Sequence, residues 1–506
     1  MKLVQLIRQW CRDNLVFTKS IVFILGLIFS YKLVEKTFLD ILITRITYEW
    51  KDYDFRQAVV VVNLQEGTAK LLVMFFAYLA DVHSGHFKMA VFSTAVCISG
   101  LSLNALAAGD DDESLELRLF YPALVLLTLA EAALPFTLRA FLDDQLRPRD
   151  LTAAAHLTDE RHSMFWWYFV AFVAGIFAQF GPIAKFKFTE LALVLAAMVD
   201  FCFILFLLGT RYYFFAPTIP NPFRDVGSVI VKAVVKRKVD YPQTPDGDQH
   251  IPPRVSWLRW VDRAAVGRGI QLGKVDDPST VEQVRRVKLL LKMLPLWSCF
   301  LTLSLVAASG STFFFEEAYS LDKVSIRDII FFANLQRFTE LVVSVISNYT
   351  VERLKRYSEQ KMELVRIGIG MFCCTLCCVV AWATAAAQRQ RETDIGMYWL
   401  TPRYLLLGIT AGLTGDGLQL FYKSQVLESL FRFVPPFVEF VTGVGRYLSI
   451  VCVVIFSRKP FEWFQKDLED SRLDKYYIFL GCLSFGNFVV YCLVARWYGY
   501  DNRWSS

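Results

Sequence analysis

The sequence predicts an all-α membrane protein with about twelve transmembrane helices. Hydrophobic residues make up 55% of the 506 residues and charged residues 20%, and the mean hydropathy is +0.38. The apolar residues gather in blocks of roughly 20, which is the length of helix that crosses about 30 Å of hydrocarbon. Backbone groups in lipid must bond internally, so the blocks are predicted to be helices, and the alternating pattern of β-barrel strands does not occur in the sequence.

The apolar blocks form two groups, which a long polar stretch separates. We predict spans at 20–46, 57–80, 88–108, 118–142, 164–185 and 189–210, and then at 287–315, 327–347, 364–387, 398–422, 434–456 and 476–497. The basic N-terminus precedes an uncleaved first span, because no small-residue cleavage site follows it. The predicted domains are an N-terminal six-helix half at 1–210, a linker at 211–286 and a C-terminal six-helix half at 287–506.

Lysine and arginine residues predict the orientation of the helices. They gather in the linker and in the loops after the fourth and eighth spans, whereas the loop after the third span carries the acidic run Asp110 to Glu113. Cytoplasmic loops of membrane proteins are enriched in these basic residues, so both termini and the 211–286 linker are predicted to be cytoplasmic. We place this multi-pass protein in the plasma membrane in preference to the vacuolar membrane.

Two stretches of the linker mix apolar and basic residues. One runs from Val229 to Lys238, and the other runs from Val255 to Val266 and carries two tryptophans beside arginines. Either both stretches lie as amphipathic helices on the inner membrane face, or they pack against the helix bundle.

Ionisable residues inside the first span are the main candidates for function, because a charge at the bilayer centre costs about 2.5–3.5 kcal/mol. This span carries Lys32, Glu35, Lys36 and Asp40. The spacing places Lys32, Glu35 and Lys36 on one face of a helix. Such a concentration of charge favours a water-filled path between helices over a purely structural bundle.

Later spans carry further ionisable residues, which are Glu66, Lys70, Glu131, Arg337, Glu340, Asp416, Glu439 and Arg446. Glu66 is spaced to pair with Lys70, and Arg337 with Glu340, within single helices. For each of these residues taken alone, a structural ion pair is the alternative to a functional role.

Glycines are concentrated in the predicted tenth span. Gly408 and Gly412 form a G-x-x-x-G pattern, and Gly415 and Gly417 follow it. Small residues at this spacing let two membrane helices approach closely. The alternative is a flexible helix that takes part in gating.

Several motifs occur in the order in which a known transporter family carries them. They lie at 80–88 (ADVHSGHFK), 165–169 (FWWYF), 258–265 (LRWVDRAA), 284–297 (VRRVKLLLKMLPLW) and 311–314 (STFF). The corresponding family motifs are A-D-x-x-x-G-R-[FY], F-N-W-W-Y-F, L-R-F-L-D-K-A-A and V-E-E-V-K-L-L-L-R-L-I-P-I-W, and STFF stands at the family's spacing after the last. The chain therefore resembles the plant nitrate/peptide transporter family, in the proton-dependent oligopeptide transporter branch of the major facilitator superfamily.

The resemblance implies a fold of two six-helix halves that rock about a central site. It places Asp81 and Gly85 on the cytoplasmic hinge loop as gating residues. The substrate-binding residues that it implies, together with the charged cluster of the first span, are Lys32, Glu35, Lys36, Trp297, Asp416 and Gln419.

The sequence departs from the family pattern at four positions that usually carry charge. The first-span motif E-x-x-E-[RK] has Lys32 in place of its first glutamate, and the span-four lysine before Pro135 is Leu134. In the tenth span Leu420 takes a glutamate position, and in the loop after the second span His86 takes an arginine position. These changes put the usual proton coupling in doubt.

We therefore predict a secondary transporter of small anionic solutes, such as nitrate, a peptide or a hormone, with proton coupling altered or lost. Lys32 and Lys36 favour the ionised form of Glu35, and a basic cavity attracts anions. Alternatively, Asp416 carries the proton. The predicted partners are a small-molecule substrate, protons and the lipid bilayer; neither nucleic acid, nor a cofactor, nor a metal is predicted, and the oligomeric state is left open.

Two other function classes compete with the transporter. An enzyme working in the membrane needs a general base or metal ligands, usually histidine, but all five histidines fall in predicted cytoplasmic loops. An enzyme is therefore not predicted. A non-transporting sensor or receptor on the same scaffold is the alternative that uptake measurements would distinguish.

Overall fold

A computed structural model describes residues 19–39, 42–49, 54–107, 113–146, 169–170, 173–174, 188–218, 221–236, 258–265, 281–320, 326–353, 359–390, 396–425 and 428–501. The described part is almost entirely helical and contains no strand. Nine of its helices are long and apolar enough to cross a membrane. The fifth predicted span, at 164–185, lies almost wholly outside the described residues, as does Asp40.

The N-terminal half consists of α2 (Lys19–Val34), η1 (Glu35–Leu39), α3 (Leu42–Glu49), α4 (Phe55–Tyr78), η2 (Leu79–Ser84), α5 (His86–Ala107), α6 (Glu113–Leu146), α8 (Phe188–Leu208) and η5 (Gly209–Tyr212). Helices α2, α5, α6 and α8 enclose an apolar cluster that includes Ile24, Leu134 and Phe206. Because these side chains are wholly apolar and close-packed, this half has a core of its own.

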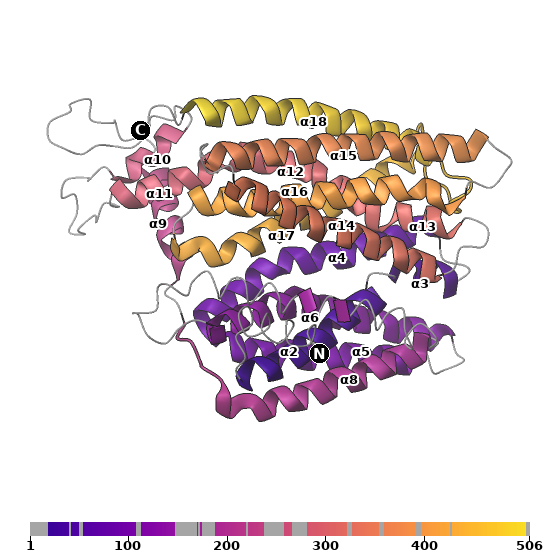
Figure 1. The fold of residues 1–506 in the computed structure, drawn as a ribbon, viewed down its shortest axis with the longest axis horizontal. Coiled ribbons are helices and arrows are strands. Elements are labelled where there is room, and N and C mark those ends of the chain that lie inside the picture. The colour runs from indigo at the N-terminus through magenta and orange to yellow at the C-terminus, as the bar shows by residue number, and fades with distance from the viewer. Residues whose placement is uncertain are drawn as a thin grey trace, which may run out of the picture.

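The C-terminal half consists of α12 (Leu294–Ser311), α13 (Phe313–Tyr319), α14 (Ile326–Arg353), α15 (Glu359–Gln390), η8 (Met397–Leu400), α16 (Thr401–Gln425), η9 (Glu428–Phe433), α17 (Val434–Phe456) and α18 (Leu473–Asp501). Its apolar cluster also takes in Phe55 and Val59 of α4. Helix α4 therefore packs on both halves, and it runs beside α17 along their boundary (Figure 1).

Glycines bring helices together at two places. A Cβ atom on Gly443 of α17 would lie 2.9 Å from the carbonyl oxygen of Gly67 on α4. A Cβ atom on Gly412 of α16 would lie 2.5 Å from the carbonyl oxygen of Glu340 on α14. The G-x-x-x-G pattern of the tenth span thus supports close packing of α16 on α14.

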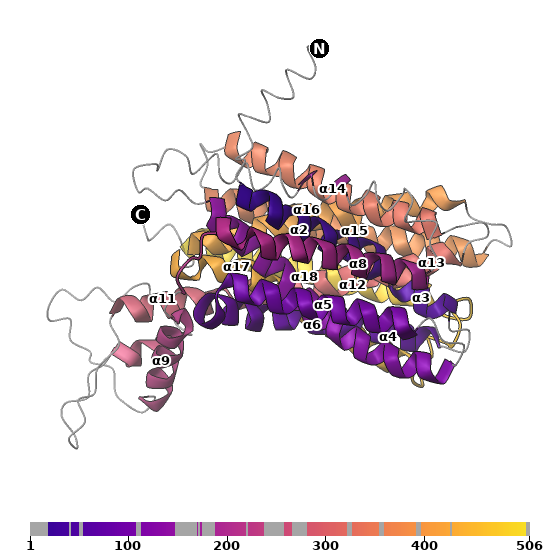
Figure 2. The same cartoon turned by 90° about the horizontal axis from the view of Figure 1, so that it is seen from below.

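The linker helices gather at one end of the bundle, which we call the linker end, and Figure 2 shows α9 and α11 beyond the spanning helices there. They are α9 (Pro222–Val235), α10 (Arg259–Asp262), η7 (Arg263–Ala265) and α11 (Val281–Lys292). Val229, Val261 and Val287 belong to their shared apolar cluster. The Asn221 side chain donates to the Tyr78 hydroxyl at 2.9 Å, which joins α9 to the end of α4. The described part of the linker therefore packs together against the bundle.

Candidate functional site

The first helix changes its winding at the charged motif. Residues 19–34 form the α-helix α2, whereas Glu35–Leu39 form the π-helical segment η1. Single π-helical turns often occur at functional sites, because the wider turn redirects the side chains that follow. Here the change falls between Lys32 and Lys36, so that both lysines reach the carboxylate of Glu35.

Three cations converge on Glu35. The ammonium nitrogen of Lys32 lies 2.5 Å from Oε2, and that of Lys36 lies 2.9 Å from Oε1. From the other half, Arg337 of α14 places Nη1 3.3 Å from Oε1. The structure therefore brings Lys32, Glu35 and Lys36 together and adds Arg337, which connects the two halves.

Helices α4 and α17 also exchange ion pairs across the boundary between the halves. Lys70 lies 2.6 Å from Oε2 of Glu439, and Glu66 pairs with Arg446. The predicted pair of Glu66 with Lys70 is therefore wrong. The close glycine contact between α4 and α17 puts an opposite charge from the other half within reach of each side chain, and each takes that partner instead.

Glu131 of α6 and Glu340 of α14 complete the central cluster. Gln65 donates its amide Nε2–H to Oε2 of Glu131 at 2.5 Å. Glu340 faces the charges of Lys36 and Lys70. Within the part of the chain that the structure describes, neither carboxylate has a cation within salt-bridge distance.

The residues described above form a group of five basic and five acidic side chains, which we call the central cluster. Its members are Lys32, Lys36, Lys70, Arg337 and Arg446 against Glu35, Glu66, Glu131, Glu340 and Glu439. The cations gather most closely at Glu35, whose carboxylate is contacted by three of them.

The contacts given for the other predicted binding residues are with partners other than Glu35. Asp416 accepts from Asn348 Nδ2 at 3.0 Å and from Arg366 Nη2 at 3.3 Å, which ties it to the C-terminal half. Gln419 lies three residues further along α16 and is half-buried. Trp297 of α12 packs on the Phe437 ring, with 4.1 Å between the ring centroids.

A second polar network lies at the linker end and contains the predicted gating residues. Asp81 belongs to η2, which ends at Gly85 with a φ of 78°. This backbone conformation is strained for residues with a Cβ atom, so glycine suits the sharp turn into α5. His86 then opens α5, although the sequence placed it in a loop.

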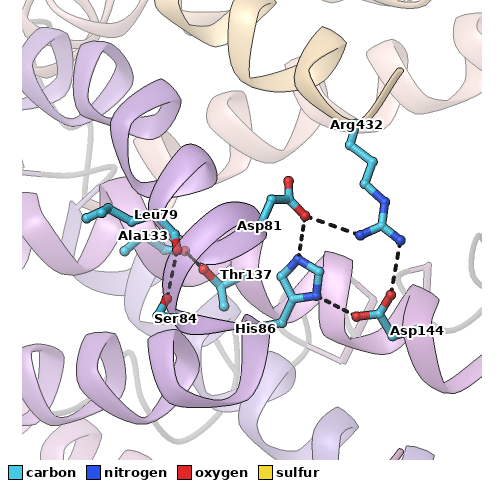
Figure 3. A network of polar contacts seen from close by, with 8 residues as sticks. All are labelled: Leu79, Asp81, Ser84, His86, Ala133, Thr137, Asp144 and Arg432. Carbon is cyan, nitrogen blue, oxygen red and sulfur yellow. Dashed lines mark hydrogen bonds and ion pairs between the residues drawn. The ribbon is translucent and has the colours of Figure 1, made fainter. Parts of the chain in front are cut away.

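His86 and Arg432 each bridge the same two carboxylates (Figure 3). His86 Nε2 lies 3.0 Å from Asp81 Oδ1, and its Nδ1 lies 2.5 Å from Oδ2 of Asp144. Arg432 of η9 places Nη1 3.2 Å from Asp81 and Nη2 3.3 Å from Asp144. The network thus ties η2, α5 and α6 of one half to η9, the segment before α17, of the other. We call these four residues the linker-end network.

Sequence reasoning missed Asp144 and Arg432. Neither lies in one of the family motifs of the sequence, and 288 residues separate them along the chain. The available signal was weak: each is a charge near the end of a predicted span on the same side of the membrane as Asp81. At the opposite end of the bundle, the halves also meet, where the Phe55 backbone N–H donates to the Lys466 carbonyl at 3.0 Å.

Comparisons with known proteins agree with this architecture. Residues 87–468 match the sequence model of the POT family. Similar proteins of Arabidopsis thaliana include Protein NRT1/PTR FAMILY 5.7, with 24% identity over 95% of this chain and 88% of the relative. Another is Protein NRT1/PTR FAMILY 5.12, with 26% identity over 87% of this chain and 85% of the relative.

Solved structures show the same fold. The crystal structure of an auto-inhibited POT family peptide transporter superposes with a TM-score of 0.76 at 15% identity, covering 95% of this chain and 97% of the other. The POT family transporter PepTSo gives a TM-score of 0.75 at 14% identity, covering 96% and 99%. The predicted major facilitator fold is confirmed.

Proposed function

Since the chain belongs to the POT family of transporters, we propose that it carries small anionic solutes across the membrane by alternating access to a central site. The observation that supports this choice of substrate is the convergence of Lys32, Lys36 and Arg337 on the single carboxylate of Glu35. Cations that gather at one point of the bundle create a positive potential, which attracts an anion.

An anion entering the central cluster competes with Glu35 for its cations. Arg337 belongs to α14 and the two lysines to the first helix, so a bound anion is held by both halves at once. Guanidinium groups bind planar oxyanions through paired hydrogen bonds. Nitrate and carboxylates, including those of peptides and hormones, therefore fit this position.

Proton coupling through the first-span motif is altered or lost in this proposal. A carboxylate that accepts from three cationic groups strongly favours its ionised form, so Glu35 is a poor proton carrier. Asp416 contacts Arg366 and accepts a hydrogen bond from Ser344, so it belongs to a separate network of the C-terminal half.

Alternating access further requires a gate, and we assign this role to the linker-end network with Asp81 and Gly85. We place the linker, at 211–286, and both termini in the cytoplasm, so that this gate faces the cell interior. The units that move are the half at 1–210 and the half at 287–506, and the membrane is the plasma membrane.

The proposal predicts saturable uptake of at least one anion by the purified protein in liposomes. The panel consists of nitrate, succinate and a dipeptide, each radiolabelled and each tested at two external pH values. Lys36→Gln removes one cation that would touch the anion, and a hydrogen bond to a charged group contributes about 1.5–3 kcal/mol. We therefore expect the KM to rise about tenfold or more.

The control is Arg389→Gln, because Arg389 forms an exposed ion pair with Asp474 on the surface of the C-terminal half. It should leave uptake unchanged. If the wild-type protein binds one of these solutes and transports none of them, the chain acts as a sensor, and the transport proposal is wrong.

A further inference from the structure

The carboxylates inside the bundle differ in whether a cation neutralises them. Most have one, and the pairs are Glu35 with Lys32, Lys36 and Arg337, Glu66 with Arg446, Glu439 with Lys70, Glu317 with Arg403, and both Glu363 and Asp416 with Arg366. Glu131 and Glu340 have no such partner within the described ranges. An unpaired charge in the membrane interior is costly, so a neutral carboxylic acid is favoured at both of these positions.

The amide of Gln65, which lies against Glu131, has both a hydrogen-bond donor and an acceptor, and so matches a protonated carboxyl group. Gln65 is 3% exposed and donates its Nε2–H to Oε2 of Glu131 at 2.5 Å. The carbonyl oxygen Oε1 of the same amide is buried, and no described residue donates a hydrogen bond to it. An ionised carboxylate only accepts hydrogen bonds, whereas a protonated one also donates from its hydroxyl. A proton on Glu131 would therefore supply the donor that the buried amide lacks.

The charged groups that face Glu131 come from the elements packed on α6. Helix α4 contributes Glu66 and Lys70. Helix α2 carries Lys32, which pairs with Glu35 of the adjoining η1, and Glu35 acts on Glu131 as a like charge. Helix α5 carries its histidine and lysine in its first turn, beside the linker-end network, and further along its only ionisable group is Cys97. The strongest of these electrostatic influences on Glu131 is the carboxylate of Glu66, a like charge. No described residue donates a hydrogen bond to Glu340 as Gln65 does to Glu131, so Glu131 is the better site for a proton.

We propose that Glu131 is the proton-binding carboxyl of this protein and that it couples the proton to the contact between the halves. The step is a simple protonation: the carboxylate of Glu131 takes one proton from the aqueous pathway and becomes a neutral acid, and the reverse step returns the proton to water. This assignment rests on the proposed transport function, because it gives an anion carrier a proton to move with its substrate.

Lys70 links the proton to the conformational change. It lies 2.6 Å from Glu439 of the other half, and its charge also acts on Glu131. When Glu131 is neutral, Glu439 is the stronger partner of Lys70 and the contact between α4 and α17 holds. When Glu131 is ionised, it competes for Lys70 and weakens that contact.

Infrared difference spectroscopy on the purified protein in lipid nanodiscs tests this directly and needs no substrate. Titrating the wild-type protein with acid should produce a carbonyl-stretching band of a protonated carboxyl group. We expect this band to be lost in Glu131→Gln, and to shift in frequency in both Glu131→Asp and Gln65→Leu. The shifts in these two variants keep the test valid if Glu131→Gln does not fold.

The matched control is Asp416→Asn, which removes an intramembrane carboxylate that Arg366 already neutralises. This variant should keep the band. A band that survives in Glu131→Gln, or that disappears in Asp416→Asn, overturns the assignment. Because the spectrum is independent of uptake, a Glu131 band in a protein that moves no solute supports the proton site and contradicts only the transport proposal.

Discussion

Replacing Arg337 with glutamine is expected to lower anion uptake into proteoliposomes by about tenfold to a hundredfold. Arg337 is the cation by which α14 reaches Glu35, with 3.3 Å between Nη1 and Oε1. Its loss removes the contribution of the second half to the bound anion, and a hydrogen bond to a charged group contributes about 1.5–3 kcal/mol. Initial rates over a range of nitrate concentrations measure the effect.

The conservative variant Arg337→Lys should recover part of the activity, because it restores the charge without the planar fork of the guanidinium. The control Arg353→Gln changes an exposed arginine on the same helix, which contacts only the Tyr349 side chain among the interactions that the structure gives for it. Equal uptake by Arg337→Gln and the wild-type protein would show that the anion binds elsewhere in the bundle.

Replacing Arg432 with glutamine is expected to open the linker end. Asp81 and Asp144 are buried, and Arg432 is the partner that reaches them from the C-terminal half. Removing one member of a buried ion pair costs about 3–5 kcal/mol, whereas an exposed pair contributes about 0–1 kcal/mol. The variant should therefore favour the conformation in which this end is open, and its concentrative uptake should fall.

Hydrogen–deuterium exchange measures this opening without a transported solute. Amides of η2 and of the first turn of α5 should exchange faster in Arg432→Gln than in the wild-type protein. Arg458→Gln is the control, because Arg458 is exposed at the opposite end of the bundle. Unchanged exchange at η2 in Arg432→Gln would mean that His86 alone holds the two carboxylates and that the gate lies elsewhere.

Hydropathy predicted the fold well because few backbone structures are stable in lipid. A block of apolar residues in a bilayer must satisfy its own backbone, so spans such as 57–80 and 434–456 are predictable from composition alone. The clustering of Lys32, Glu35 and Lys36 was likewise predictable, because these residues are three or four apart on one turn of the chain. Helical periodicity is therefore sufficient to predict a contact when the two residues lie close together in the sequence.

The same local reasoning failed where partners come from different halves. Spacing favoured a pair of Glu66 with Lys70, but helix packing gives both residues partners on α17. Nothing in the sequence near Asp81 points to Arg432, which lies 351 residues away. Glu131 was one of several charges in predicted spans, and only the structure shows that Gln65, and not a cation, lies against it.

The central claim is that the two halves alternate about the Glu35 cluster. Pulsed electron spin resonance tests it most directly, with one pair of spin labels at each end of the bundle. The labelled residues at the linker end are Lys88 and Lys361, which are exposed in the first turns of α5 and α15. The labelled residues at the other end are Leu106 and Tyr398, which are also exposed. The labels are introduced through unnatural amino acids, because the chain has 11 cysteines.

Adding a transported anion should lengthen the distance at one end and shorten it at the other, since rocking about a central site opens one side as it closes the opposite one. Arg432→Gln should lengthen the distance between the labels at Lys88 and Lys361 without any added anion. Distances that stay constant at both ends, or that change in the same direction, would contradict alternating access about this cluster.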